Sequence, residues 1–223
     1  MSADDEREQR ILDAARDLIV RFGYDKTTVL EIADGAGISK GTVYLHFDSK
    51  QELFETLLTR ETIRASEALV DYLQTDANAG TVGSVFRGML EAQHSSELMK
   101  AIYRQDAKIL GSYLHAADNI FETAYNRSVH RMFIEGMQEA GAIRRELDAD
   151  VLAHVFDIID YGFISIAEVK KTEDIPAHEA TIEMVAEILE RALTPEDGEI
   201  DREASNAVIR ELIESYEEVL GDG

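Results

Sequence analysis

The 223-residue sequence contains no cysteine, no tryptophan and only two prolines. Without cysteine it can form no disulfide, no thiol nucleophile and no cysteine-ligated zinc site. Positive charge is scarce as well: 22 Lys and Arg stand against 45 Asp and Glu, which gives a formal net charge of −23. Because DNA is itself a polyanion, this charge taken alone argues against nucleic acid as a partner.

Long apolar runs and a basic leader are also missing. No stretch approaches the ~18–20 uncharged apolar residues that a membrane span needs. The chain starts with an acidic segment, which is the opposite of the basic start of a signal peptide. We therefore expect a cytoplasmic protein without a membrane partner. Because 45% of the residues are hydrophobic, an acidic disordered tail is excluded too.

What is present is helical periodicity, which runs through nearly the whole chain and predicts an all-α fold. Both prolines fall between periodic segments, where helices are expected to stop or start. The expected helices cover residues 4–22, 29–36, 40–46, 49–73, 80–94, 96–110, 116–140, 150–170, 177–193 and 201–220. We divide them into a DNA-binding domain (1–50), a ligand-binding and dimerisation domain (51–193) and an acidic extension with one amphipathic helix (194–223).

Two short helices near the N-terminus form a helix-turn-helix pattern. Thr28-x-x-Glu31 and Ser49-x-x-Glu52 are capping boxes. Gly37 is expected to end the first of the two short helices, and Ser39 is placed to cap the second one. Small and polar residues on that second helix are expected to face outward, and such a helix fits the ~12 Å wide major groove of B-DNA. Val43 and Phe47, one helical turn apart, are expected to pack inward. The pattern also occurs in proteins that never touch DNA.

The same segment resembles the DNA-binding domain of TetR/AcrR-type regulators over roughly residues 8–56, in order and register. The resemblance implies a homodimeric transcriptional regulator, usually a repressor, with an N-terminal three-helix domain and a C-terminal helical bundle that binds a small-molecule effector and dimerises. The implied DNA partner is a near-palindromic double-stranded operator. The match is carried by residues 11–15, 22–24, 27–28, 32–33, 36–44, 46–47, 49–50 and 53–54.

The resemblance also implies roles for particular residues. Hydroxyl, amide and lysine groups at the starts of the helices meet phosphates and base edges, and a glycine allows close approach to the DNA. Two positions depart from the family: Gly35 stands where Ala is more usual, and Leu45 stands where a polar or aromatic residue is frequent, so one backbone contact is expected to be missing. The DNA-contacting residues implied are Thr28, Ser39, Lys40, Gly41, Thr42, Tyr44, His46 and Lys50.

Aromatic and methionine side chains recur at helical spacing in the middle of the chain. They fit either an ordinary hydrophobic core or an effector pocket between helices, and the resemblance favours a pocket. The candidates for its lining are Phe86, Met89, Tyr103, Tyr125 and Tyr161.

The expected helix 150–170 is apolar on more than one face, so it must be covered on nearly all sides. Together with helix 177–193 it suits either a central position inside one chain or a four-helix interface across a twofold axis. The resemblance favours the interface, for which the candidates are Val155, Ile159, Phe163, Ile182, Val185 and Leu189.

Two rival classes remain. An all-α interaction or adaptor protein that keeps the fold without binding DNA is favoured by the acidic surface and opposed by Lys40, Lys50 and Tyr44. An enzyme has no catalytic constellation to support it, and the six histidines show no metal-ligand spacing. We therefore expect neither catalysis nor a metal or cofactor.

The negative charge is unevenly distributed. Residues 1–50 carry −3 and residues 51–223 carry −20, and residues 38–50 hold two Lys and one Asp. A local positive face is what DNA binding requires, so most of the acid lies away from the segment that would read DNA. A halophilic host would explain the acidic remainder, because salt near ~1 M shortens the Debye length to ~3 Å and screens repulsion from DNA.

Overall fold

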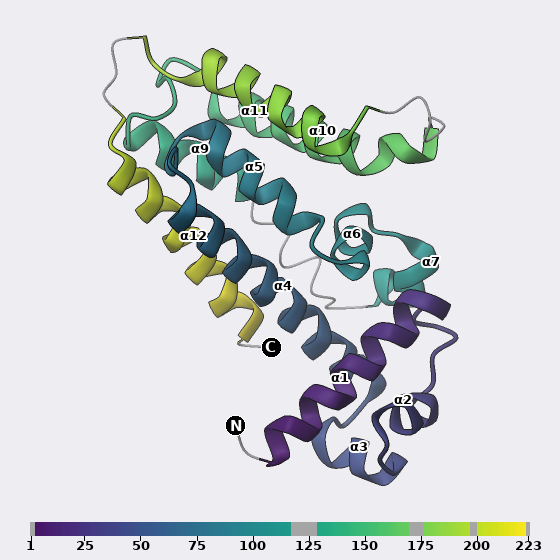
Figure 1. The fold of residues 1–223 in the computed structure, drawn as a ribbon. Coiled ribbons are helices and arrows are strands. Elements are labelled where there is room, and N and C mark those ends of the chain that lie inside the picture. The colour runs from purple at the N-terminus through teal and green to yellow at the C-terminus, as the bar shows by residue number, and fades with distance from the viewer. Residues whose placement is uncertain (1–2, 117–128, 170–175, 197–199, 222–223) are drawn as a thin grey trace. The chain divides into compact units, whose positions relative to one another are not determined.

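The computed structural model describes residues 3–116, 129–169, 176–196 and 200–221 (Figure 1). Every regular element in these ranges is a helix, so the prediction of an all-α fold is confirmed. None of the described helices is long and apolar enough to cross a membrane.

The chain forms two compact units, and each contains two separate stretches of sequence. Unit 1 comprises Met1–Arg64 and Ser96–Thr123, and unit 2 comprises Ala65–Ser95 and Ala124–Gly223. The helix-turn-helix segment therefore shares a unit with a stretch that follows it by about fifty residues, which the sequence pattern does not indicate. The assignment of separate functions to residues 1–50, 51–193 and 194–223 stays a prediction.

Unit 1 is built around α1, which packs on α2, α6 and α7. Its core joins apolar side chains of the first four helices to Leu98, Leu110 and Tyr113 from the later stretch. The helices of this unit are α1 (Ala3–Phe22), α2 (Val29–Ala36), α3 (Lys40–His46), the first part of α4 (Lys50–Thr75), α6 (Glu97–Arg104), α7 (Ala107–Leu110) and the 3-10 helix η1 (Gly111–His115).

The prediction of one helix over residues 96–110 is wrong, because the first helix ends at Arg104 and Gln105 is its C-cap. This residue has a left-handed φ of 50°, and the N–H of Asp106 bonds back to the carbonyl of Ala101 at 2.9 Å, which closes α6. Asp106 then caps α7 by accepting from the N–H of Lys108 at 2.8 Å. A side chain that can cap a new helix thus competes with continuation of the old one.

The later stretch is fastened to the loop after α1 by direct bonds. The N–H of Tyr24 donates to the carbonyl of Ile109 at 2.7 Å, and the carboxylate of Asp25 accepts from the hydroxyl and the N–H of Ser112 at 2.5 and 3.1 Å. The bonds from Ser112 lower the pKa of Asp25. Residues 109–112 are therefore part of the same folded body as the helix-turn-helix segment.

The described part of unit 2 contains the rest of α4 and five further helices, with α5 packed along α11, and α9 packed on α10 and α12. Gly83 makes the α5–α11 approach possible, because a Cβ there would lie 2.8 Å from the carbonyl oxygen of Ala186. Glu190 of α11 also accepts from the N–H of Gly83 at 2.8 Å, which caps α5. The helices are α5 (Val82–Gln93), α9 (Val129–Glu139), α10 (Ala149–Val169), α11 (His178–Leu193) and α12 (Arg202–Gly221).

The acidic C-terminal extension contributes to unit 2. Ile209 of α12 is buried in its core, and Gly136 of α9 faces Val208 so closely that a Cβ would collide with it. The extension thus carries an amphipathic helix packed on α9, in agreement with the pattern of its apolar residues. Of the helix expected over 116–140, the described part is α9.

His130 of α9 lies between two carboxylates of α10. Its Nδ1 is 2.6 Å from Oδ1 of Asp157 and its Nε2 is 3.1 Å from Oδ2 of Asp160. Gln93 at the end of α5 donates to the same oxygen of Asp160 at 3.0 Å. Burial disfavours the imidazolium, but the hydrogen bonds and charges of Asp160 and Asp157 outweigh burial and raise the pKa of His130. These bonds connect three helices of unit 2.

We expect His130→Gln to reduce the free energy of unfolding more at about pH 5.5 than at about pH 9. A histidine whose pKa is higher in the folded state than its unfolded value of ~6.5 adds stability that is complete below ~6.5 and is lost as pH rises through the folded value. Urea unfolding followed by far-ultraviolet circular dichroism measures the difference. The control is His154→Gln, an exposed ring 3.9 Å from Asp157, which should change less. An equal loss for His130→Gln at every pH would contradict the ion pairs.

Candidate nucleic-acid interface

The turn between α2 and α3 is defined by bonds within a few residues of sequence. Thr28 and Glu31 form the predicted reciprocal capping box at the start of α2. Gly37 ends α2 in the left-handed conformation with a φ of 69°, which glycine adopts without a steric cost. Ser39 then caps α3 by accepting from the N–H of Thr42 at 3.1 Å. The predicted helix-turn-helix is confirmed, and these caps define where α2 ends and where α3 begins.

At the start of α4 the predicted capping box is only half formed. Ser49 accepts from the N–H of Glu52 at 3.0 Å, as expected. The carboxylate of Glu52, however, accepts at 2.6 Å from the N–H of Asp48, one residue before the predicted donor. The helix still begins at Lys50, because both side chains satisfy a free backbone donor.

The packing of α2 against α1 explains why glycine stands at position 35, which the sequence alone does not show. A Cβ at this position of α2 would lie 3.2 Å from the Cβ of Ala14 and 4.0 Å from Leu18, both on α1. The first of these distances is tighter than an ordinary contact, so a larger residue would push α2 away from α1. The departure from the family pattern at Gly35 therefore fits a close α1–α2 crossing.

Helix α3 presents one face to the core and another to solvent. Val43 and Phe47 are buried, as predicted. Lys40, Gly41 and Tyr44 are exposed, with the Nζ of Lys40 5.6 Å from the centroid of the Tyr44 ring. A lysine beside an aromatic ring on an exposed helix face can contact phosphate and sugar together.

The hydroxyl groups at the helix starts are exposed but already bonded to one another. Ser39 Oγ and Thr42 Oγ1 are 2.8 Å apart. Thr28 donates from Oγ1 to the carboxylate of Glu31 at 2.8 Å, and this bond lowers the pKa of Glu31. A phosphate at the start of α2 must therefore compete with Glu31 for the Thr28 hydroxyl.

His46 and Lys50 are less available than the other candidates. The side chain of His46 is nearly buried, and its Nε2 lies 3.6 Å from Oδ1 of Asp4. Lys50 donates from Nζ to the carbonyl of Tyr24 at 2.5 Å and lies 4.0 Å from the centroid of that ring. Burial lowers the pKa of Lys50, with the charge of Asp25 opposing the shift. In this structure Lys50 ties α4 to the loop after α1, and its contact with phosphate stays a prediction.

The candidate effector residues occupy different environments. Phe86 is fully buried in the core of unit 2 and Met89 packs against that core, whereas Tyr161 of the same unit is largely exposed. Tyr103 belongs to α6 of unit 1 and is partly exposed. Tyr125 lies outside the described residues. A pocket lined by these residues stays a prediction.

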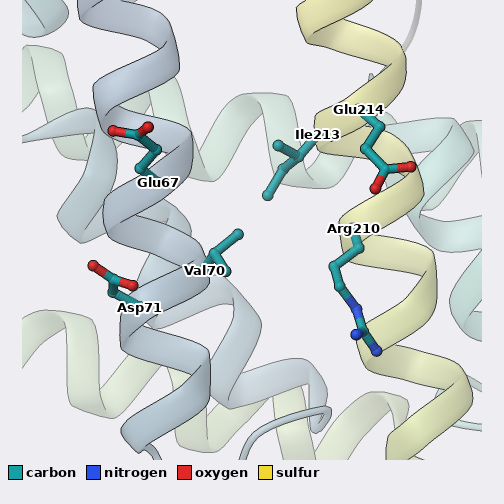
Figure 2. A pocket seen from close by; sticks show the side chains of 6 residues that line it. All are labelled: Glu67, Val70, Asp71, Arg210, Ile213 and Glu214. Carbon is teal, nitrogen blue, oxygen red and sulfur yellow. The ribbon is translucent and has the colours of Figure 1, made fainter. Parts of the chain in front are cut away.

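A groove of about 310 Å³ lies elsewhere in unit 2, between α4 and α12. In Figure 2 the apolar side chains of Val70 and Ile213 face each other across it, with charged groups around them. It includes no candidate effector residue. Its lining is Glu67, Val70, Asp71, Arg210, Ile213 and Glu214.

The candidate dimer residues point partly inward. Ile182 and Leu189 of α11 are buried, and Ile159, Phe163 and Val185 pack partly against the same core, whereas Val155 is exposed. Other apolar side chains of α10 and α11, which the sequence pattern does not separate from these, are exposed. They are Val151, Ile158, Tyr161, Ile166, Met184 and Ile188.

The fold and the exposed face of α3 define a class of protein: a helix-turn-helix DNA-binding regulator with a separate helical unit. Residues 11–57 match the family described as "Bacterial regulatory proteins, tetR family". The chain is 29% identical over 166 residues to the uncharacterized regulator YvkB of Bacillus subtilis, covering 70% of this chain and 79% of YvkB. It is 24% identical to the transcriptional repressor Rv1474c of Mycobacterium tuberculosis, covering 83% and 94% of the two chains.

Among solved structures, the chain resembles the transcriptional regulator FadR of Bacillus subtilis in complex with stearoyl-CoA. The TM-score is 0.59 at 19% identity, over 81% of this chain and 96% of FadR. At this identity the likeness concerns the fold. Residues 11–57 are thus a DNA-binding domain of the tetR type, and the chain is a DNA-binding transcriptional regulator.

Proposed function

We propose that the protein is a homodimeric repressor that binds a near-palindromic operator and leaves it when a small molecule binds. DNA binding is supported by the exposed face of α3, where Lys40, Gly41 and Tyr44 face solvent. Val43 and Phe47 on the opposite side hold the helix to the core. A dimer would place two such helices in successive major grooves ~34–36 Å apart. Such a repressor would act in the cytoplasm and would require no catalysis, metal or cofactor.

Dimerisation is supported by the apolar residues left exposed on α10 and α11. Ile158 and Ile188 are 58% and 55% exposed although they are large and apolar. In a twofold interface the same patch covers itself, so one apolar face on each chain suffices. We include the candidates Val155, Ile159, Phe163, Ile182, Val185 and Leu189 in this region, with the buried ones supporting the face from behind.

Ligand release is supported by the way the chain divides. α4 begins in unit 1 and ends in unit 2, and the chain returns to unit 1 at Ser96. The chain crosses between the units at 64/65, 95/96 and 123/124, so a rearrangement of unit 2 can be transmitted to the DNA-binding unit through three chain connections. Full switching from 1:99 to 99:1 requires a preference of ~5.5 kcal/mol for the released state. The solved complex of FadR with stearoyl-CoA supports a small-molecule effector for this chain too.

We expect the double substitution Lys40→Ala with Tyr44→Ala to weaken specific DNA binding by about 100-fold or more, because it removes a phosphate charge and an aromatic contact from both half-sites. Gel shifts with DNA from upstream of the gene measure it. The matched control is Lys100→Ala with Tyr103→Ala on α6, where Lys100 pairs with Glu97 at 2.7 Å. Unchanged specific binding by the double variant would show that this face of α3 does not read DNA, and no specific binding by the wild type would favour the rival class, an interaction protein that has kept the fold.

The halophilic interpretation of the charge predicts an unusual response to salt. A protein with ordinary phosphate contacts loses ~10³–10⁵ in affinity between about 50 and 200 mM salt. Here base contacts and DNA shape carry more of the affinity, so we expect a loss below about tenfold, or unfolding in dilute buffer. A steep slope with full stability at low salt would contradict this interpretation.

A further inference from the structure

Leu45 is the most exposed large hydrophobic side chain in the described part of the chain. It lies on α3, the helix that would enter the major groove, and 84% of its surface is open to solvent. Val43 and Phe47 supply the apolar contacts that hold this helix to the core, so the fold makes no use of Leu45. A leucine this exposed on a DNA-reading surface indicates that it contacts an apolar group of the DNA.

The neighbours of Leu45 on α3 leave room for such a partner. Gly41 is one helical turn before it on the same face, and the Leu45 side chain leans toward that turn. A Cβ built on Gly41 would meet only Ser39 Oγ, at 3.7 Å, so the surface beside Leu45 is open. On this face of α3, Gly41 thus leaves the backbone uncovered, and Leu45, one turn later, adds an exposed apolar side chain.

A second pair of residues on the exposed face of α3 is polar. Lys40 and Tyr44 are also one turn apart, with the ammonium 5.6 Å from the ring centroid. A cation and a phenol suit phosphate and sugar, whereas Leu45 can form no hydrogen bond with either. In the major groove the apolar feature is the C5-methyl group of thymine.

We propose that Leu45 reads the C5-methyl group of one thymine in each operator half-site, with Gly41 leaving space for the base. This inference rests on the proposed function, and it replaces the expectation that a contact is simply missing at this position. Leu45 then contributes specificity for thymine over cytosine, whose edge carries an amino group in place of the carbonyl and lacks the methyl group.

The test uses double-stranded DNA selected from a random library by the full chain, with each thymine replaced in turn by uracil. Uracil lacks only the methyl group. At one position per half-site we expect wild type to lose affinity about fourfold, the equivalent of one buried methyl, and about 15-fold when both half-sites are changed. For Leu45→Ala the same replacement should cost less than about 1.5-fold.

The matched control is Leu30→Ala, an exposed leucine of α2, which should keep the wild-type sensitivity to uracil at that position. Because Leu45 is outside the core, Leu45→Ala should have the same Tm as the wild type. If the selected DNA binds specifically but no uracil position distinguishes wild type from Leu45→Ala, Leu45 does not read thymine although the protein is still a DNA-binding regulator. If no specific DNA is selected at all, both the inference and the proposed function are wrong.

Discussion

Replacing Ile158 by aspartate is expected to convert the proposed dimer into monomers and to weaken operator binding by at least about 100-fold. The side chain is 58% exposed in the single chain, so the substitution does not disturb the core of unit 2. In a twofold interface it would bury two carboxylates without partners, each at a cost of several kcal/mol. Sedimentation velocity gives the change in mass, and gel shifts give the change in affinity.

The charge-matched control is Gln74→Glu, which adds the same negative charge at an exposed position of α4. It should leave both mass and affinity unchanged. Ile158→Asp that remains dimeric and binds DNA as wild type does would show that this part of α10 is not in the interface.

Replacing Tyr113 by alanine is expected to destabilise the DNA-binding unit by about 3–5 kcal/mol. Tyr113 is fully buried. The centroid of its ring lies 4.9 Å from the ring centroid of Phe54 and 5.9 Å from that of Tyr24. Because whole domains are stable by only about 5–15 kcal/mol, such a loss is a large share of the total. Specific DNA binding should fall with stability, although Tyr113 lies far from α3 in the sequence.

Tyr113→Phe separates packing from hydrogen bonding. It keeps the ring and removes only the hydroxyl, which donates to Glu55 at 3.2 Å, so we expect a loss of about 1 kcal/mol. Urea unfolding with far-ultraviolet circular dichroism compares the two variants. If Tyr113→Ala were as stable as Tyr113→Phe, the stretch beginning at Ser96 would not belong to the folded core of unit 1.

The features that sequence reasoning predicts correctly are local ones. The box at Thr28, the turn at Gly37 and the cap at Ser39 each depend on bonds between residues at most five apart, so the residue types alone indicate them. The inward pair Val43 and Phe47 follows from the helical period. The all-α fold class follows from the helical periodicity of nearly the whole chain, and the family resemblance follows from residues 8–56 alone.

The features that it misses depend on contacts between distant parts of the chain. No local signal shows that Tyr24 and Asp25 bond to residues 109–112, so the membership of that stretch in unit 1 is not apparent. Lys50 has the charge expected of a phosphate contact, yet it is held by the carbonyl of Tyr24. On α10 and α11 apolar residues occupy both buried and exposed positions, so periodicity cannot separate the core face from the exposed face.

The most direct test of the account is a hydroxyl-radical footprint of the full chain on DNA from upstream of its gene. A dimeric repressor should give two protected stretches, related by an approximate twofold axis and centred about one helical turn apart. Lys40→Ala with Tyr44→Ala should remove both, and Lys100→Ala with Tyr103→Ala should leave them. Uniform protection, or none, at every salt concentration would contradict a dimeric reader of operator DNA.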